Sequence, residues 1–330
     1  MVSLLEVSDL AVSFQALDRR LTVVDGISFR LAPGEVLGVV GESGSGKSVT
    51  ALSIMRLLGE QGAIDRGRVE LDGRDLTRLS EQEMLSVRGQ AVSMIFQEPM
   101  TSLNPVYTVG LQIAETLVEH LGIGWTEARA RAVELMGEVG IPAPAERLGQ
   151  YPHQLSGGMR QRVMVAIAIA CSPLLLIADE PTTALDVTIQ AQILELMRRL
   201  RDKTGAAIMM ITHDLGVIAD IADRVIVMYA GQIVEEASVA DLFERPQHPY
   251  TRLLLRSVPL ATAKRQRLEA IAGATPSPRQ FPSGCRFHPR CPDAVERCRS
   301  EMPVLERTSA AGGVRCWRAG EPGLLSGRPS

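Results

Sequence analysis

The chain has 330 residues, of which 45% are hydrophobic and 22% charged, and its formal net charge is −3. This length allows one sizeable core and a smaller appended unit, and the composition is typical of a soluble globular protein. The longest apolar stretch, Val163 to Cys171, is interrupted by Ser172-Pro173 and is far shorter than the ~20 residues that cross a bilayer, which excludes a membrane-spanning protein.

The first 73 residues are predicted to form mainly β-strands separated by turns. Residues 1–6 have no basic start and meet an acidic residue almost at once, so we expect no signal peptide and a cytoplasmic protein. Leu10 to Phe14 follows an alternating pattern. By this pattern alone, Phe14 is a strand residue that faces the core.

The segment Gly41 to Ser48, GESGSGKS, follows the apolar run Val36–Val40. Its glycines let consecutive backbone N–H groups turn towards phosphates, Lys47 reaches the β- and γ-oxygens, and the Ser48 hydroxyl is placed to bind Mg2+. A helical pattern over Val49–Met55 follows, and the N-terminus of a helix favours an anion. The segment therefore predicts that the chain binds a nucleoside triphosphate.

Helical patterns begin at Ser80 and return, after the stretch Gln97–Pro105, between Val109 and Gly140. We expect a helical insert in this part of the chain. Alternating strands and helices then continue to Gly231, which predicts a parallel sheet covered on both faces.

A second candidate phosphate site lies about 110 residues after the first. Leu155–Met159 opens a probable helix with one serine and two glycines, so backbone donors and the helix dipole would attract an anion. The apolar strand Leu174–Ala178 then ends in Asp179 and Glu180. Such a pair can hold Mg2+ through the aspartate and orient or deprotonate water through the glutamate; a solvated turn is the alternative.

Asp186 follows these carboxylates, and His213 comes directly after the apolar strand Ala207–Thr212. A lone histidine is usually structural. Open α/β sheets, however, place ligand-contacting residues at the carboxyl ends of their strands, which favours a functional role for His213.

In these motifs and their order, the first 255 or so residues resemble the nucleotide-binding subunits of ABC transporters. The resemblance implies an ATP site with Mg2+ and assigns its contacts to several motifs: Phe14 on adenine, Gly41, Ser43, Gly44, Ser45, Gly46, Lys47 and Ser48 on phosphate, Gln97 as the Q-loop, Ser156, Gly157 and Gly158 as the signature, Asp179 as the Walker B aspartate, Asp186 as the D-loop, and His213 as the switch.

The same resemblance implies catalytic roles for Glu180 as base, His213 at the γ-phosphate and Gln97 as a sensor of metal and water. Mg2+ would be bound by Ser48, Gln97 and Asp179. One residue departs from the family: Met159 stands where the signature usually ends in glutamine. Since the phosphate contacts come from the preceding serine and glycines, we expect activity to survive.

The implied fold is an α/β P-loop NTPase of the ABC ATPase type, with a RecA-like core, an N-terminal antiparallel β subdomain and a helical subdomain. We place the ATPase domain at residues 1–255, with the helical subdomain inserted at about 98–168, and a small cysteine-rich C-terminal extension at 256–330.

Four phrases are similar to the ATP-binding subunits of dipeptide and oligopeptide importers, the dipeptide permease type in particular: QEPMTSLNPVYTVG from Gln97, YPHQLSGGMRQR from Tyr151, TIQAQI from Thr188 and QHPYT from Gln247. This resemblance implies a heterodimer with a second ATP-binding subunit, two transmembrane permease subunits, an extracytoplasmic binding protein, a place on the cytoplasmic face of the inner membrane, and no nucleic acid.

The cargo stays open, because relatives of this kind serve nickel, glutathione or antimicrobial peptides as well as peptides. A soluble ABC ATPase acting on ribosomes or DNA is the rival hypothesis. Ribosome-type members carry two cassettes in one chain and DNA-repair types contain long coiled coils, whereas this chain has one cassette and a short gap between its motifs.

Four of the five cysteines gather in the last 46 residues, at Cys285, Cys291, Cys298 and Cys316. Disulfides are disfavoured in a reducing cytoplasm, and the short Cys-x-x-Cys pairs of zinc knuckles are absent. All-cysteine ligation suits an iron–sulfur cluster. The importer family carries a matching motif for a 4Fe-4S cluster; zinc, with His288 as a further ligand, and free thiols are the alternatives.

Two further expectations concern the fifth cysteine and the charge of the tail. We interpret Cys171 as a small core residue within an apolar helix. The last 75 residues are basic, with 13 Lys and Arg against 6 Asp and Glu. We interpret this excess as a solvated surface, with contact to anionic lipid or nucleic acid as the weaker alternative.

Overall fold

The fold is given by a computed structural model that describes residues 3–97, 102–183, 186–257, 271–309 and 312–321. The chain divides into two compact units, which are described separately. The first unit comprises Met1–Leu5, Leu31–Glu35 and Leu71–Ile211, and the second comprises Glu6–Arg30, Val36–Glu70 and Thr212–Ser330.

In the first unit, three parallel strands form the sheet in the order β8-β7-β6. Their bounds are Val92–Ile95 for β6, Leu175–Asp179 for β7 and Ala207–Ile211 for β8. Every residue of these strands is buried. Continuous apolar runs of this kind are typical of parallel strands covered on both faces, as the sequence predicted.

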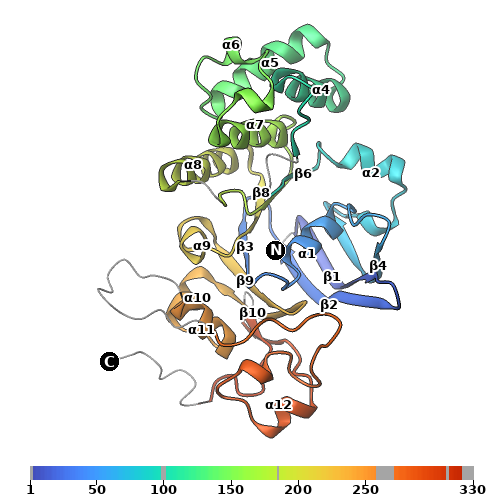
Figure 1. The fold of residues 1–330 in the computed structure, drawn as a ribbon, viewed down its shortest axis with the longest axis vertical. Helices are drawn as coiled ribbons and strands as arrows, with labels where there is room; N and C mark the ends of the chain where they lie inside the picture. The colour runs from blue at the N-terminus through green and yellow to red at the C-terminus, as the bar shows by residue number, and fades with distance from the viewer. Residues whose placement is uncertain (1–2, 98–101, 184–185, 258–270, 310–311, 322–330) are drawn as a thin grey trace. The chain divides into compact units, whose positions relative to one another are not determined.

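The other elements of the first unit are mostly helices, and α4, α5, α6 and α7 gather together (Figure 1). Their bounds are β5 Arg74–Asp75, η1 Leu76–Arg78, α2 Glu81–Val87, α4 Val109–Leu121, α5 Trp125–Glu138, α6 Pro144–Arg147, η2 Pro152–Gln154, α7 Gly157–Ile169 and α8 Val187–Thr204. Ser80 caps α2 with a reciprocal capping box with Glu83, which explains why the helix begins there. The helices expected between Val109 and Gly140 are confirmed.

In the second unit, β2 (Arg20–Leu31), β1 (Leu5–Gln15) and β4 (Gly62–Leu71) lie side by side in that order. A connection of only four residues joins β1 to β2, so these two neighbours must run antiparallel.

A second sheet of this unit has the order β11-β12-β10-β9-β3. β3 runs parallel to β9, whereas the pairs β9–β10, β10–β12 and β12–β11 are antiparallel. The strand bounds are β3 Val36–Val40, β9 Arg224–Tyr229, β10 Gln232–Ser238, β11 Glu306–Ser309 and β12 Gly312–Val314. The last two strands come from the C-terminal part of the chain, so that part extends the sheet that begins with β3.

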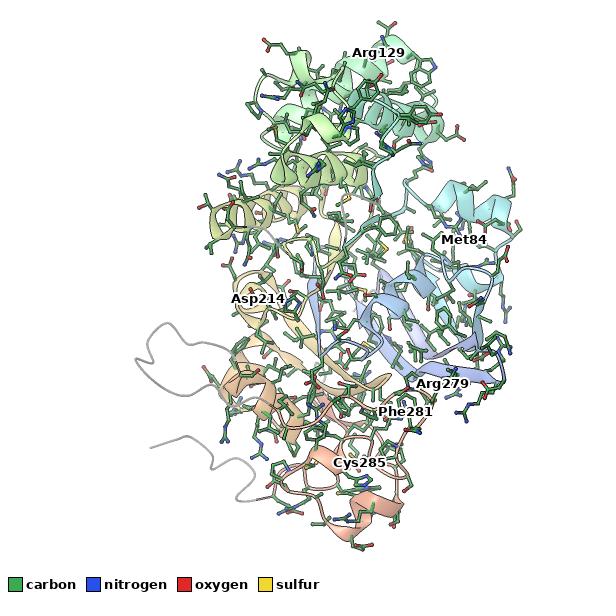
Figure 2. All side chains as sticks on the ribbon, viewed as in Figure 1. Met84, Arg129, Asp214, Arg279, Phe281 and Cys285 are labelled. Atoms are coloured by element: carbon green, nitrogen blue, oxygen red, sulfur yellow. The ribbon has the colours of Figure 1, made fainter. Side chains whose placement is uncertain are left out.

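The helices of the second unit are α1 Lys47–Ile54, α9 Leu215–Ile221, α10 Val239–Glu244, α11 Pro249–Arg256, η3 His288–Arg290 and α12 Glu296–Ser300. We call residues 271–321 the C-terminal segment; Cys285 and Phe281 lie in it (Figure 2). Within the described parts of the chain, no helix is both long and apolar enough to cross a membrane.

Candidate active site

The phosphate loop, Gly41 to Ser48, lies in the second unit between β3 and the start of α1. Gly41 (φ +152°), Gly44 (φ +79°) and Gly46 (φ +101°) adopt conformations that L side chains rarely do. A Cβ on Gly41 would lie 2.2 Å from the Met228 carbonyl oxygen, so glycine is required there for packing as well. The glycines expected from the motif are therefore needed by the backbone path itself.

Lys47 begins α1, and its ammonium group folds back over the loop. Its Nζ donates to the carbonyl oxygens of Gly41 (2.7 Å) and Glu42 (3.1 Å), and it lies 3.4 Å from Ser45 Oγ. The loop is tied to the adjacent sheet as well, because the Gly231 N–H donates to the Ser45 carbonyl at 2.9 Å. These bonds hold the loop around the Lys47 ammonium group, which would contact the phosphate oxygens.

Glu42 is a residue whose importance the sequence did not indicate. Its backbone N–H donates to the hydroxyl of Tyr250 at 2.9 Å, and its carboxylate accepts from Thr275 and Arg290. These partners lie 208 to 248 residues away along the chain. Local spacing carries no signal for such pairs.

The two carboxylates expected from the sequence, Asp179 and Glu180, lie at the carboxyl end of β7 in the first unit. Asp179 is the last residue of the strand and is 5% exposed. Glu180 follows it with φ +49°, a left-handed conformation that is strained for a residue with a side chain. Strained backbone of this kind clusters at functional sites. A solvated turn, the alternative, does not explain the nearly complete burial of Asp179.

The structure brings together Gln97 and Glu180, the residues predicted to be the Q-loop glutamine and the catalytic base. Gln97 Nε2 donates to Glu180 Oε2 at 3.1 Å, and Thr183 Oγ1 donates to the same oxygen at 2.8 Å. The backbone N–H of Glu180 donates to the Ile211 carbonyl of β8 at 2.8 Å. The carboxylate is thus oriented by two side-chain donors and by a fixed backbone.

The signature residues begin α7, as predicted. Ser156 is the N-cap residue, and its hydroxyl accepts from the Met159 N–H at 3.3 Å; Gly157 and Gly158 form the first turn. Met159 contributes its backbone to this cap, whatever its side chain, which is consistent with the expected tolerance of methionine there. Gln161, from the next turn, donates to the Pro181 carbonyl at 2.6 Å and ties α7 to the turn after Glu180.

The remaining site residues are distributed between the units. Asp186 caps α8 and accepts from the Ile189 N–H at 2.9 Å, so it has a structural role beside the expected D-loop contact. His213 is exposed just after β8, and Phe14 is half-buried near the end of β1. Phe14, the phosphate loop with Ser48, and His213 belong to the second unit; Gln97, the signature, Asp179, Glu180 and Asp186 belong to the first.

The four C-terminal cysteines line one cavity of the second unit: Cys285, Cys291, Cys298 and Cys316. All are free thiols. Burial raises the pKa of Cys291 to about 12 and that of Cys316 to about 11, so these thiols are protonated at neutral pH, and a bound metal would have to displace their protons.

The 4Fe-4S cluster expected from the sequence has no independent support in the described residues. In the described part of the chain, no three His, Cys, Asp or Glu side chains are close enough together to hold one metal ion. A four-iron cluster needs one thiolate on each of its irons, so its ligands stand farther apart than those of a single zinc ion. Four cysteine thiols around a shared cavity are the type of donor that such a cluster uses.

Two expectations need correction. Cys171 is not inside a helix: α7 ends at Ile169, and Cys171 is half-buried in the turn that follows, 3.8 Å from the Thr116 carbonyl. The basic tail is not simply a solvated surface either. Arg286 is 8% exposed and pairs with Asp25 at 2.5 Å, and the Arg290 side chain is 5% exposed. Part of the excess charge is used in internal ion pairs.

The comparisons agree with this geometry. Residues 24–183 match the family described as ABC transporter, and residues 234–298 match the oligopeptide/dipeptide transporter C-terminal region. The oligopeptide transport ATP-binding protein AppD of Bacillus subtilis (strain 168) is 52% identical over 98% of this chain and 99% of its own length. The dipeptide transport ATP-binding protein DppD of Escherichia coli (strain K12) is 50% identical over 96% of both chains.

Among solved structures, the chain is similar to a dimeric structure of the ATP-binding cassette MJ0796 in a post-hydrolysis state with ADP and Pi. The TM-score is 0.65 at 26% identity, over 71% of this chain and 98% of that one. The likeness bears out the mixed α/β cassette expected from the motifs.

Proposed function

Because this chain belongs to the ABC transporter family, with the C-terminal region of the oligopeptide/dipeptide transporters, we propose that it binds and hydrolyses ATP to energise the import of dipeptides or oligopeptides. The relatives that share half or more of its residues over almost its whole length carry such names. ATP hydrolysis is the activity that the site geometry supports best.

The observation that carries the proposal is the orientation of Glu180 by Gln97. A general base needs a carboxylate held in hydrogen-bonding reach of water, and here two donors fix that carboxylate at the end of a buried strand. Glu180 would orient the attacking water and accept its proton, while His213 contacts the γ-phosphate.

The phosphate loop supplies the other half of the chemistry. Its backbone donors and Lys47 bind the β- and γ-phosphates, where negative charge grows during phosphoryl transfer. Ser48, Gln97 and Asp179 would hold Mg2+, which neutralises that charge when bound.

The proposed working unit is a heterodimer with a second ATP-binding subunit, in which each phosphate loop faces the partner's signature. The position of Ser156 supports this arrangement: an exposed serine and two glycines open α7, so their donors are available to a phosphate from outside the chain. The cassette MJ0796 was itself solved as a dimer. Closure around ATP, followed by reopening after hydrolysis, would drive transport.

The proposed partners in the membrane are two permease subunits, supplied by an extracytoplasmic substrate-binding protein, with this chain on the cytoplasmic face. Peptides are the cargo that the relatives' names favour over nickel or glutathione. The match of residues 234–298 to a transporter region opposes a soluble ABC ATPase acting on ribosomes or DNA.

We further propose that the cysteine cavity holds a 4Fe-4S cluster through Cys285, Cys291, Cys298 and Cys316. Four free thiols around one cavity support the proposal, because all-cysteine ligation suits such a cluster; zinc with His288 is the alternative. Such a cluster would supply redox chemistry or structural support for the C-terminal segment.

A growth experiment tests the import function. The gene is deleted in its own host, the strain is made auxotrophic for one amino acid, and that amino acid is supplied only as a dipeptide. Growth should be lost, restored by the wild-type chain, and not restored by Lys47→Ala. If the deletion strain uses the dipeptide as well as its parent does while a free amino acid supports both, the peptide assignment is wrong.

A further inference from the structure

Glu42 of the phosphate loop contacts the C-terminal segment. Two nitrogens of Arg290 donate to its two carboxylate oxygens, Nη1 to Oε2 at 2.6 Å and Nη2 to Oε1 at 2.9 Å. Thr275 Oγ1 donates to Oε2 at 3.0 Å. The side chains of Arg290 and Glu42 are 5% and 29% exposed. Bidentate pairs of this kind are strong and geometrically specific, unlike exposed ion pairs.

Arg290 is itself held by the segment that carries it and by Tyr229 of β9. Nε donates to the Ala272 carbonyl at 2.9 Å, Nη2 lies 3.3 Å from the carbonyls of Ile271 and Gly273, and Nη1 lies 3.3 Å from the Tyr229 hydroxyl. The guanidinium therefore cannot follow a loop that moves away. The Arg290 guanidinium therefore restrains the Glu42 side chain. The next residue in the chain, Cys291, lines the cysteine cavity.

The main chain of Glu42 transmits this restraint to the site. Its N–H donates to the Tyr250 hydroxyl at 2.9 Å, and its carbonyl accepts from Lys47 Nζ at 3.1 Å. Tyr250 is fully buried and packs against Phe287 of the C-terminal segment, with ring centroids 5.3 Å apart. The side chain and the backbone of Glu42 are thus both held, by Arg290 and by Tyr250 respectively.

We propose that Arg290 is a positioning residue of the nucleotide site, which holds the phosphate loop in its binding conformation through Glu42. A loop that is ordered before binding loses less entropy when phosphate binds, so affinity rises without any direct contact to the ligand. In this proposal the C-terminal segment contributes to ATP affinity by ordering the phosphate loop. This inference rests on the proposed function, since it presupposes ATP binding.

The test uses the full-length chain with Mg2+ and a fluorescent ATP analogue. Arg290→Ala should raise the dissociation constant about tenfold, which corresponds to about 1.4 kcal/mol. Arg290→Lys keeps the charge but loses the two-pronged geometry, so it should recover only part of the affinity. Arg299→Ala is the matched control. This arginine lies in the same segment, its side chain is 61% exposed, and its ion pair with Glu296 is long, at 3.7 Å. Its removal should leave the affinity for ATP unchanged.

A double-mutant cycle distinguishes positioning from general destabilisation. If Arg290 acts through Glu42, the Glu42→Ala/Arg290→Ala variant should bind ATP no more weakly than either single variant. In hydrolysis assays, KM for ATP should rise while kcat at saturating ATP stays near the wild-type value. If Arg290→Ala does not fold, the same double-mutant cycle can be measured with Glu42→Gln and Arg290→Lys, for which smaller losses of affinity are expected.

Two results would overturn the proposal, and a third concerns the function itself. Wild-type affinity in Arg290→Ala, with normal binding by the wild-type chain, refutes the positioning role and leaves the ATPase function intact. Additive losses in the double variant also refute it. Absence of ATP binding by the wild-type chain instead refutes the proposed function.

Discussion

The amide nitrogen of Gln97 lies 3.1 Å from a carboxylate oxygen of Glu180, two residues separated by 83 positions in the chain. A glutamine that donates to a carboxylate holds that carboxylate in place. A movement of Gln97 would therefore change the orientation of the Glu180 carboxylate. In the proposed cycle, this contact links the hydrolysis step to the segment that follows Gln97.

The first prediction follows from this pair. Glu180→Gln keeps the size of the side chain and removes the base, so ATP hydrolysis by the assembled transporter should fall at least about 100-fold while ATP binding is retained. Phosphate release and nucleotide retention measure the two effects. Glu146→Gln, an exposed glutamate of α6, is the control and should behave as wild type. Hydrolysis at the wild-type rate in Glu180→Gln would show that another group is the base.

The second prediction concerns two glycines of the phosphate loop. Gly41→Ala places a Cβ against the Met228 carbonyl at 2.2 Å, so the free energy of unfolding without nucleotide should fall by about 3 kcal/mol. Gly44→Ala meets no atom within 4 Å and should lose only about 1 kcal/mol, from its positive φ. Urea denaturation measures both. Equal losses would mean that the contact with β9 does not constrain the loop.

The third prediction separates the two roles of Ser156. Ser156→Ala removes an N-cap and should cost about 1 kcal/mol of stability, as should Ser80→Ala, which removes the equivalent cap of α2. Only Ser156→Ala should also reduce ATP hydrolysis by the heterodimer, by about tenfold or more. The reason is that the Ser156 hydroxyl and the first turn of α7 would face the partner's nucleotide. Equal hydrolysis by the two variants contradicts a signature role.

The fourth prediction decides between the two interpretations of Phe14, which is half-buried. If its ring stacks on adenine, Phe14→Leu should weaken ATP binding about tenfold and reduce stability little. Phe243→Leu, at a 38% exposed aromatic of α10, should change neither quantity. Titration with a fluorescent nucleotide and thermal melting give the answer. Lost stability with unchanged affinity would identify Phe14 as a strand residue only.

The fifth prediction concerns the cysteine cavity. Protein purified without oxygen should contain iron and sulfide and absorb visible light, and Cys291→Ser should lose most of both. Cys171→Ser should retain them, because Cys171 belongs to the first unit and is not among the residues that line the cavity. Metal analysis by mass spectrometry is the measurement. Colourless wild-type protein with one zinc per chain would establish the alternative metal.

Much of the candidate site was readable in the sequence because its motifs are local. A phosphate loop, a capped signature helix and two acids after an apolar strand each occupy fewer than ten consecutive residues. Their backbone requirements, a positive φ or a helix N-terminus, are met by the residue types within the motif itself. For this reason the predicted starts of α2 and α7, at Ser80 and Ser156, agree with the structure.

The sequence by itself determined the class of protein and the order of its motifs, and it predicted which residues form the ATP site. Only the tertiary structure decided that Arg290 lies on Glu42, that Tyr250 holds the backbone of that residue, and that the four cysteines share one cavity. The physical reason is that these contacts join segments far apart in the chain. Their partners are selected by how the strands of the second unit pair and pack, which no local pattern of residues records.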